Sequence, residues 1–356
     1  MPIVEANEST LDAAMSARLA RRFLSAEGLF LDSHLSSHPH LIVPVEQMLD
    51  WFTNIEEISA QPLGRRLAHA AADHETWRQM NRPTKVPSGI FSKAKRIPWL
   101  MDDWQERGVG KLRTIEEGRV CVEQQVQTAM AGGQGAGAWE ILQGSRFRFR
   151  WEQHDSGRTD IILESDAREA HPPRKMVASW QERKPQQTET GFPKVDKNDA
   201  GWEFEGRRCF LMARDLILRL EDEMLPHVEV RFDDELIRFG GLEDESREVV
   251  WNILARAEQR SFINQGEHVI VAEKSHWQMA VEAMVGRRGH GGLESLDYID
   301  NNGGVEFIFK TVFHPALLLG RLMGCWQRAN GRQPRGEWSS TASGCKILIL
   351  ARHEIA

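Results

Sequence analysis

His38 and His40, in the stretch SSHPHL, are two side chains whose spacing could support metal chemistry. Two imidazoles so close together can chelate a divalent cation, but a zinc site needs three or four protein ligands. We therefore interpret the polar stretch around Pro39 as a solvated loop. The four cysteines are scattered and form no CxxC pair, which favours free thiols in a reducing compartment.

Several other stretches match functional motifs only in part. RGHGGL, at 288–293, has a histidine among glycines, but it lacks the strand–loop–helix setting of a phosphate-binding loop. The acidic pairs Asp102–Asp103 and Asp233–Asp234 are interpreted as solvated side chains on exposed segments. The sequence contains no GxSxG, HExxH, Walker or Rossmann fingerprint, so none of those reactions is indicated.

The overall composition predicts a soluble protein with substantial hydrophobic cores. The chain has 356 residues, of which 41% are hydrophobic and 27% charged, and its net charge is -7. This length favours about two domains, and the acidic balance argues against nucleic-acid binding. No stretch approaches the ~18 apolar residues of a membrane span, and MPIVEANEST does not resemble a signal peptide. We expect a cytoplasmic protein that binds neither nucleic acid nor membrane.

The spacing of apolar residues predicts helices at 9–27, 44–76 and 98–107, followed by a series of strands and helices. In RFRFRW, Arg146, Arg148 and Arg150 would face one side of a strand and the aromatic residues the other. That arginine row could bind an anion or a partner's acidic surface, or form a plain exposed face. Further strands are predicted at RVCVEQQV, TDIILES, HVEVRFDDELIRF, EHVIVAE, VEFIFKTVF and KILILAR, and further helices at AMAGGQGAGAWEIL, RRCFLMARDLILRLEDEML, ESREVVWNILARAEQ, HWQMAVEAMVGR and around LLLGRLMGCWQ.

A repeated pattern links the two halves of the chain. RGVGKL, at 107–112, resembles RGHGGL, at 288–293, and the pattern G-x-W-x4-G-x6-W-x5-G begins once at Gly137 and again at Gly324. Its tryptophans are Trp139 and Trp151 in the first copy and Trp326 and Trp338 in the second. Glycine serves tight turns and close packing, and Trp fills large gaps in a core. The match therefore predicts an internal duplication, with two α+β lobes in which helices pack on an antiparallel sheet.

The second copy resembles the V4R, or 4-vinyl-reductase-like, domain family over residues 207–356. The resemblance is carried by GRLMGCWQRANGR, then Glu337, then Gly344–Cys345 and the closing strand ILILAR. The first copy resembles the family more faintly, through the repeat. The resemblance implies two tandem lobes that can enclose a small, largely apolar ligand, and it does not imply a single reaction.

Some V4R domains bind zinc through Cys, Glu, Cys and Cys, and the resemblance places His314, Glu337, Ser340 and Cys345 at those positions. It thus implies a zinc site formed by His314, Glu337 and Cys345, with an open fourth position. The alternative is structural: His314 would begin a helix with proline in its first turn, and Cys345 would be a small core residue. The equivalent positions in the first copy hold Gln127, Arg150 and Arg158, which are not such ligands, so the first lobe should bind no metal there.

These observations predict an N-terminal helix and loop (1–40), a degenerate V4R-like lobe (41–182), a linker (183–206) and a V4R-like lobe (207–356). The expected function is that of a small-molecule-binding or accessory protein acting through a partner. By resemblance, that partner could be an enzyme complex of bacterial methylated-amine catabolism, with betaine or dimethylglycine as substrates. Two alternatives stay open: a metal-dependent reductase or lyase using the C-terminal site, and a homodimeric scaffold.

Overall fold

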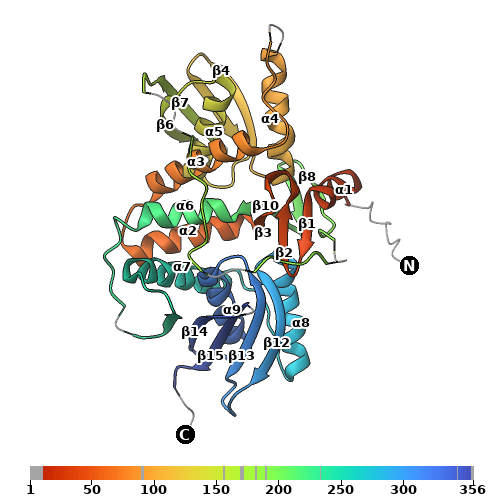
Figure 1. Cartoon of the computed structure of the whole chain (residues 1–356), viewed down its shortest axis with the longest axis vertical. Helices are drawn as coiled ribbons and strands as arrows, with labels where there is room; N and C mark the ends of the chain where they lie inside the picture. Colours follow the sequence, from red (N-terminus) through yellow and green to blue (C-terminus); the bar gives the residue numbers. More distant parts are fainter. Residues whose placement is uncertain are drawn as a thin grey trace, which may run out of the picture.

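The computed structural model describes residues 11–353, except 90–91, 155–156, 169–171, 181–182, 189–190, 233 and 343. Helices and three sheets alternate along the chain, so the predicted α+β class is confirmed. A four-stranded sheet lies at one end of the long axis and a five-stranded sheet at the other, with helices and a six-stranded sheet between them (Figure 1). No helix in the described residues combines the length and apolar character needed to cross a membrane.

Apart from α1 in the first half and β11 in the second, the helices and strands follow the same order in both halves of the chain. The first half contains α1 (Ala13–Arg22), β1 (Phe23–Ala26), β2 (Leu29–Asp32), β3 (His38–Pro44), α2 (Val45–Ser59), α3 (Gly64–Asn81), α4 (Lys93–Arg107), β4 (Lys111–Glu116), β5 (Arg119–Glu123), α5 (Thr128–Gln143), β6 (Phe147–His154) and β7 (Arg158–Ser165). The second half contains β8 (Asp196–Asn198), β9 (Gly201–Phe204), β10 (Arg207–Ala213), α6 (Arg214–Met224), β11 (Ile237–Gly240), α7 (Glu245–Asn264), α8 (Lys274–Met284), β12 (Gly291–Tyr298), β13 (Val305–Val312), α9 (Pro315–Asn330), β14 (Pro334–Thr341) and β15 (Gly344–Ala351).

The two end sheets have the same strand order. One runs β4-β5-β7-β6 and the other β12-β13-β15-β14, with β11 added next to β14. The repeated tryptophans take equivalent places: Trp139 and Trp326 lie on α5 and α9, and Trp151 and Trp338 on β6 and β14. The sequence repeat therefore coincides with a repeat of the three-dimensional arrangement.

Both halves share the central sheet, whose order is β1-β2-β3-β10-β9-β8. Its middle strands, β3 and β10, pair antiparallel, and Ile42 lies opposite Leu211. The helices that follow them begin at equivalent places. Helix α2 begins at Val45, three residues after Ile42, and α6 begins at Arg214, three residues after Leu211. The sheet therefore has an approximate twofold axis at the Ile42–Leu211 pair.

Small residues let equivalent helices approach closely in each half. A Cβ atom on Gly133 of α5 would lie 1.9 Å from the carbonyl oxygen of Ala68 on α3. On Gly320 of α9 it would lie 2.2 Å from the carbonyl oxygen of Ala255 on α7. Both residues of the first contact are the repeat equivalents of the residues in the second, which explains why glycine is needed at both positions.

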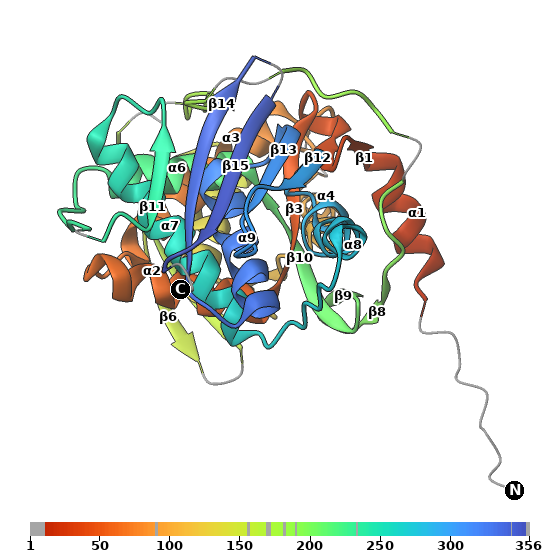
Figure 2. The ribbon, with the colours of Figure 1, turned by 90° about the horizontal axis from the view of Figure 1, so that it is seen from below.

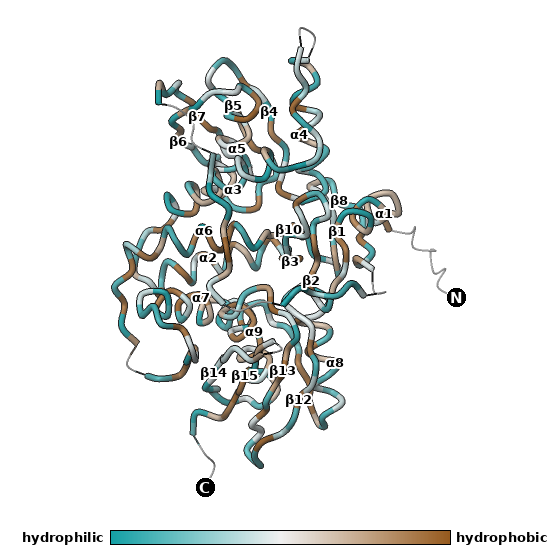
Figure 3. The backbone as a smooth tube through the Cα atoms, viewed as in Figure 1, coloured by the Kyte–Doolittle hydropathy of each residue, from teal (hydrophilic) through white to brown (hydrophobic). Residues whose placement is uncertain are grey.

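The central strands differ from the sequence prediction. The stretch around Pro39, interpreted as a loop, contributes to β2 and β3, and RRCFLMA, predicted as helix, is β10. The predicted linker, 183–206, includes β8 and β9, and EHVIVAE is not a strand. Figure 3 shows hydrophobic residues along the strands of the central sheet and along β13 and β15. Because the central strands are buried on both faces, they lack the alternation that identifies a half-exposed strand.

The acidic pair Asp102–Asp103 was predicted to be solvated, and for Asp103 this is wrong. Its carboxylate is buried and accepts hydrogen bonds from Arg22 at 2.6 Å, from Arg78 at 2.9 Å and from Arg107 at 2.9 Å. On α4 these neighbouring residues point in different directions, so Asp102 stays exposed. A carboxylate can be buried here because several guanidinium groups surround it.

Candidate functional site

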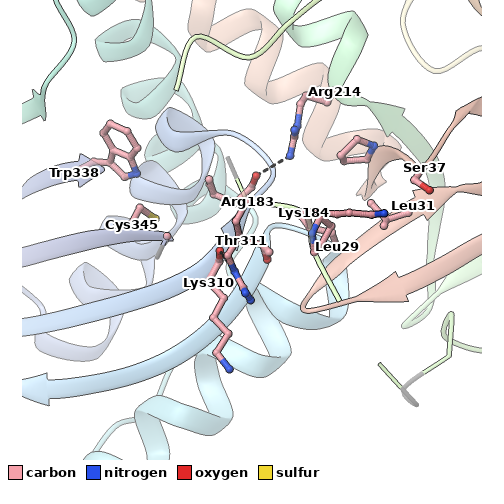
Figure 4. A pocket seen from close by; sticks show the side chains of 14 residues that line it. Leu29, Leu31, Ser37, Arg183, Lys184, Arg214, Lys310, Thr311, Trp338 and Cys345 are labelled. Atoms are coloured by element: carbon pink, nitrogen blue, oxygen red, sulfur yellow. Dashed lines mark hydrogen bonds between the residues drawn. The ribbon is translucent and has the colours of Figure 1, made fainter. Parts of the chain in front are cut away.

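A pocket of about 290 Å³ lies where the C-terminal sheet meets the central sheet and the segment that connects the two halves (Figure 4). One part of its wall is apolar, formed by side chains of β2, β3 and β13–β15. The other part carries four cations, from the connecting segment, α6 and β13. The apolar members are Leu29, Leu31, Pro39, Val312, Trp338 and Cys345, and the cationic members are Arg183, Lys184, Arg214 and Lys310.

The two arginines are held by the surrounding backbone. Arg214, the first residue of α6, is buried and donates a hydrogen bond to the carbonyl oxygen of Val312 at 2.7 Å. Its guanidinium group also lies 5.4 Å from the ring of Trp180. Arg183 donates to the carbonyl oxygen of Lys310 at 3.1 Å and pairs with Glu27. These contacts fix the arginines before any ligand binds, which lowers the entropic cost of binding.

The two lysines carry charges that no described carboxylate neutralises. Neither Lys184 nor Lys310 forms an ion pair with a carboxylate among the described residues. No described acidic side chain lines the pocket. The pocket therefore has a positive potential beside an apolar wall, which suits a small organic anion.

The three side chains that the V4R resemblance implies for zinc do not come together. Cys345 faces the core beside the pocket, whereas Glu337 lies on the opposite, exposed face of the C-terminal sheet. His314 is buried and does not line the pocket, and its ring lies 5.1 Å from that of Trp180. Among the described residues, no group of three or more His, Cys, Asp or Glu side chains is arranged to hold a metal.

His314 has a structural role that its counterpart in the first half shares. It caps α9, because its Nδ1 accepts a hydrogen bond from the backbone N–H of Ala316 at 3.2 Å. Its repeat equivalent, Gln127, caps α5 by accepting from Met130 at 2.8 Å. With Nδ1 as acceptor, Nε2 of His314 carries the proton and donates to buried Glu221. An N-cap accounts for a polar residue at this buried position.

The cysteine thiols are all buried, and we expect them to be unreactive in the folded protein. Burial raises the pKa of Cys345 to about 11, although the neighbouring indole of Trp338 acts in the opposite direction. Burial likewise raises the pKa of Cys209 and of Cys325 to about 12. Iodoacetamide at pH 7.5 should label fewer than one of the four cysteines per native chain and all four in guanidinium chloride, as counted by mass spectrometry. Rapid labelling of Cys345 in the native protein would contradict this assignment.

Sequence reasoning missed the cationic residues of the pocket. Arg183 and Lys184 fall in the stretch interpreted as a linker, and Arg214 and Lys310 belong to two distant elements. No periodicity or spacing connects these four residues, which approach one another only in the tertiary structure. The adjacent pair Arg183–Lys184 was the one local signal, and in a polar segment it is typical of any solvated stretch.

Comparison with models of protein families, with curated proteins and with solved structures gives no match for this chain. The V4R resemblance therefore stays a prediction.

Proposed function

We propose that this protein binds a small organic anion with an apolar body, and that it acts as a binding or accessory protein through a partner. The observation that carries the proposal is that Lys184 and Lys310, which pair with no described carboxylate, line a pocket that also has an apolar wall. The acidic group of the ligand would lie near Lys184, Lys310 and Arg214, and its hydrocarbon part against Leu29, Leu31 and Val312. The V4R resemblance, which implies a small-molecule-binding fold, points the same way.

The charge of the pocket also narrows the ligand class. Betaine and dimethylglycine carry a carboxylate, but they also carry a cationic nitrogen and have little apolar surface. The cations of the pocket would repel that nitrogen, and the apolar wall would gain little from it. If the protein serves methylated-amine catabolism, we propose that its own ligand is a different, purely anionic compound.

A series of straight-chain carboxylates from butanoate to decanoate tests this proposal. We expect octanoate to raise the melting temperature of the purified protein, with 1-octanol and octylamine having little effect. Affinity measured by calorimetry should rise with chain length and fall with added salt, because both the apolar wall and the charges contribute. Failure of every carboxylate to bind below about 5 mM would exclude an organic-anion pocket.

Lys310→Gln should weaken octanoate binding about tenfold, since it removes one of the uncompensated charges. Lys346→Gln is the matched control: this lysine lies on neighbouring β15, pairs with Glu306 at 3.5 Å, and does not line the pocket. Equal effects of the two substitutions would mean that the anion binds elsewhere.

A further inference from the structure

The two halves differ at one edge of their end sheets. In the second half, β11 lies parallel to β14, with Ile237 opposite Gly336 and Phe239 opposite Trp338. Figure 2, from below, shows the C-terminal sheet with β11 and β14. In the first half, β6 is the edge strand: β7 pairs with it on one side, and no strand of the described residues pairs with its other side.

The halves differ at this edge because one connection between two helices is longer in the second half than in the first. The link between α6 and α7, residues 225–244, has room for β11, whereas the link between α2 and α3 consists of residues 60–63 alone. In the first half, β6 is thus the equivalent of β14, but the short link 60–63 has no room for an equivalent of β11.

In the second half, β11 seals the side of the lobe. Ile237 and Phe239 are buried, and the ring of Phe239 lies 5.1 Å from that of Trp251 on α7. Just before β11, Asp234 accepts a hydrogen bond from Arg256 of α7 at 3.0 Å. The segment therefore lies across both β14 and α7.

At the corresponding place in the first half there is a groove of about 280 Å³ between α3, α5 and the start of β6, with Pro173 and Glu223 of α6 also in its lining. His69, which lines it, is the repeat equivalent of Arg256. Phe149 also lines the groove and is only half-buried, as is Trp151 farther along β6, whereas Gly336 and Trp338 of β14 are buried. The groove thus has both apolar and polar lining residues, and in the second half the equivalent surface is covered by β11.

We propose that the open edge of β6 and this groove bind an extended segment of a partner protein, which adds parallel to β6 as β11 adds to β14. Strand addition of this kind uses backbone hydrogen bonds for affinity and alternate side chains for specificity. Apolar side chains at two alternate positions of the segment would cover Phe149 and Trp151, as Ile237 and Phe239 cover the equivalent part of β14.

The charges on the outer face define the residue between those two apolar positions. Arg238 of β11 lies in register with Glu337, so opposite charges are adjacent on that face. The residue equivalent to Glu337 in β6 is Arg150, whose side chain is 65% exposed and pairs at 3.5 Å with the exposed Glu152. A complementary segment therefore carries Asp or Glu between two large apolar residues. Pairing with a second copy of β6 is disfavoured, because it would bring the exposed Arg148 and Arg150 of both copies together.

Two peptides and the full-length protein test the proposal. The first peptide, DELIRFGG, copies residues 234–241, and the second carries the change Arg238→Glu, giving the apolar–acidic–apolar pattern. Fluorescence anisotropy of labelled peptides should show the Glu peptide binding with a Kd below about 1 mM, roughly tenfold more tightly than the Arg peptide. Binding of neither peptide, or equal binding of both, would overturn the proposal.

Reversing the charge of one residue on β6 tests whether the peptide binds at this edge. Arg150→Glu should reverse the preference, so that the Arg peptide binds more tightly. Arg113→Glu, at a side chain of β4 that is 63% exposed on the opposite edge of the sheet, should leave the preference unchanged. Circular dichroism would show that both variants are folded, and the comparison of peptides on the unaltered protein stands without them. If sedimentation shows a dimer that Arg150→Glu dissociates, the occupant is a second copy and the proposal is wrong.

Discussion

Asp103→Asn is expected to lower the free energy of unfolding by about 3 to 5 kcal/mol, the cost of breaking a buried ion pair by removing one partner. The carboxylate of Asp103 accepts hydrogen bonds from Arg22, Arg78 and Arg107, and all four side chains are buried. An amide at this position would leave these guanidinium groups with too few negative charges in a region from which water is excluded. Urea denaturation followed by tryptophan fluorescence measures the change.

Asp102→Asn is the matched control for this substitution. Asp102 is the preceding residue on α4 and is exposed, so its replacement should change the free energy of unfolding by less than about 0.5 kcal/mol. A similar, small effect of both substitutions would show that the ion cluster around Asp103 contributes little to stability.

The effect of Asp103→Asn should also depend on pH. Burial by itself raises the pKa of Asp103, but Arg107 and Arg22 outweigh it and hold the pKa well below the usual 3.8. A carboxyl group with a lowered pKa contributes stability that is fully present above its usual pKa and is lost as the pH falls toward the folded value. The difference in unfolding free energy between the unaltered protein and the variant should therefore be larger at pH 7 than at pH 3. A difference that grows on acidification would contradict the direction of this shift.

Gly320→Ala is expected to destabilise the protein by about 3 kcal/mol, because the new methyl group would lie 2.2 Å from the carbonyl oxygen of Ala255. The contact is with backbone rather than with a flexible side chain, so α9 and α7 would have to move apart. Gly133→Ala makes the equivalent contact with Ala68 at 1.9 Å and should have a comparable effect. Thermal and urea denaturation of the two variants give the values.

Gly64→Ala provides the control for a glycine in a helix. Its added methyl group would meet no atom closer than 3.9 Å, so we expect unchanged or slightly greater stability, since alanine favours the helix by up to about 1 kcal/mol. If Gly320→Ala were as well tolerated as Gly64→Ala, the helix pair would not depend on the close approach described above.

Strands in the end sheets could be predicted from the sequence, whereas those in the central sheet could not. In β6, one face is half-buried and the other is exposed, so aromatic residues alternate with arginines and the period of two is visible. In β10, Cys209 and Leu211 face one buried layer, and Phe210 and Met212 the other. A short, wholly apolar run of this kind is compatible with either a strand or a buried helix.

The sequence by itself determined the repeat, because glycines at tight turns and helix contacts, and tryptophans in large gaps, are needed wherever the same arrangement recurs. It also determined the α+β class. Whether an individual polar residue is buried, exposed or part of the pocket was decided by the tertiary structure alone. Asp103 is buried, Glu337 is exposed, and Arg183, Lys184 and Lys310 line the same pocket. The physical reason is that the charge environment of a side chain depends on partners that are distant in the chain, such as Arg22 beside Asp103 and Lys310 beside Arg183, and no local pattern specifies these partners.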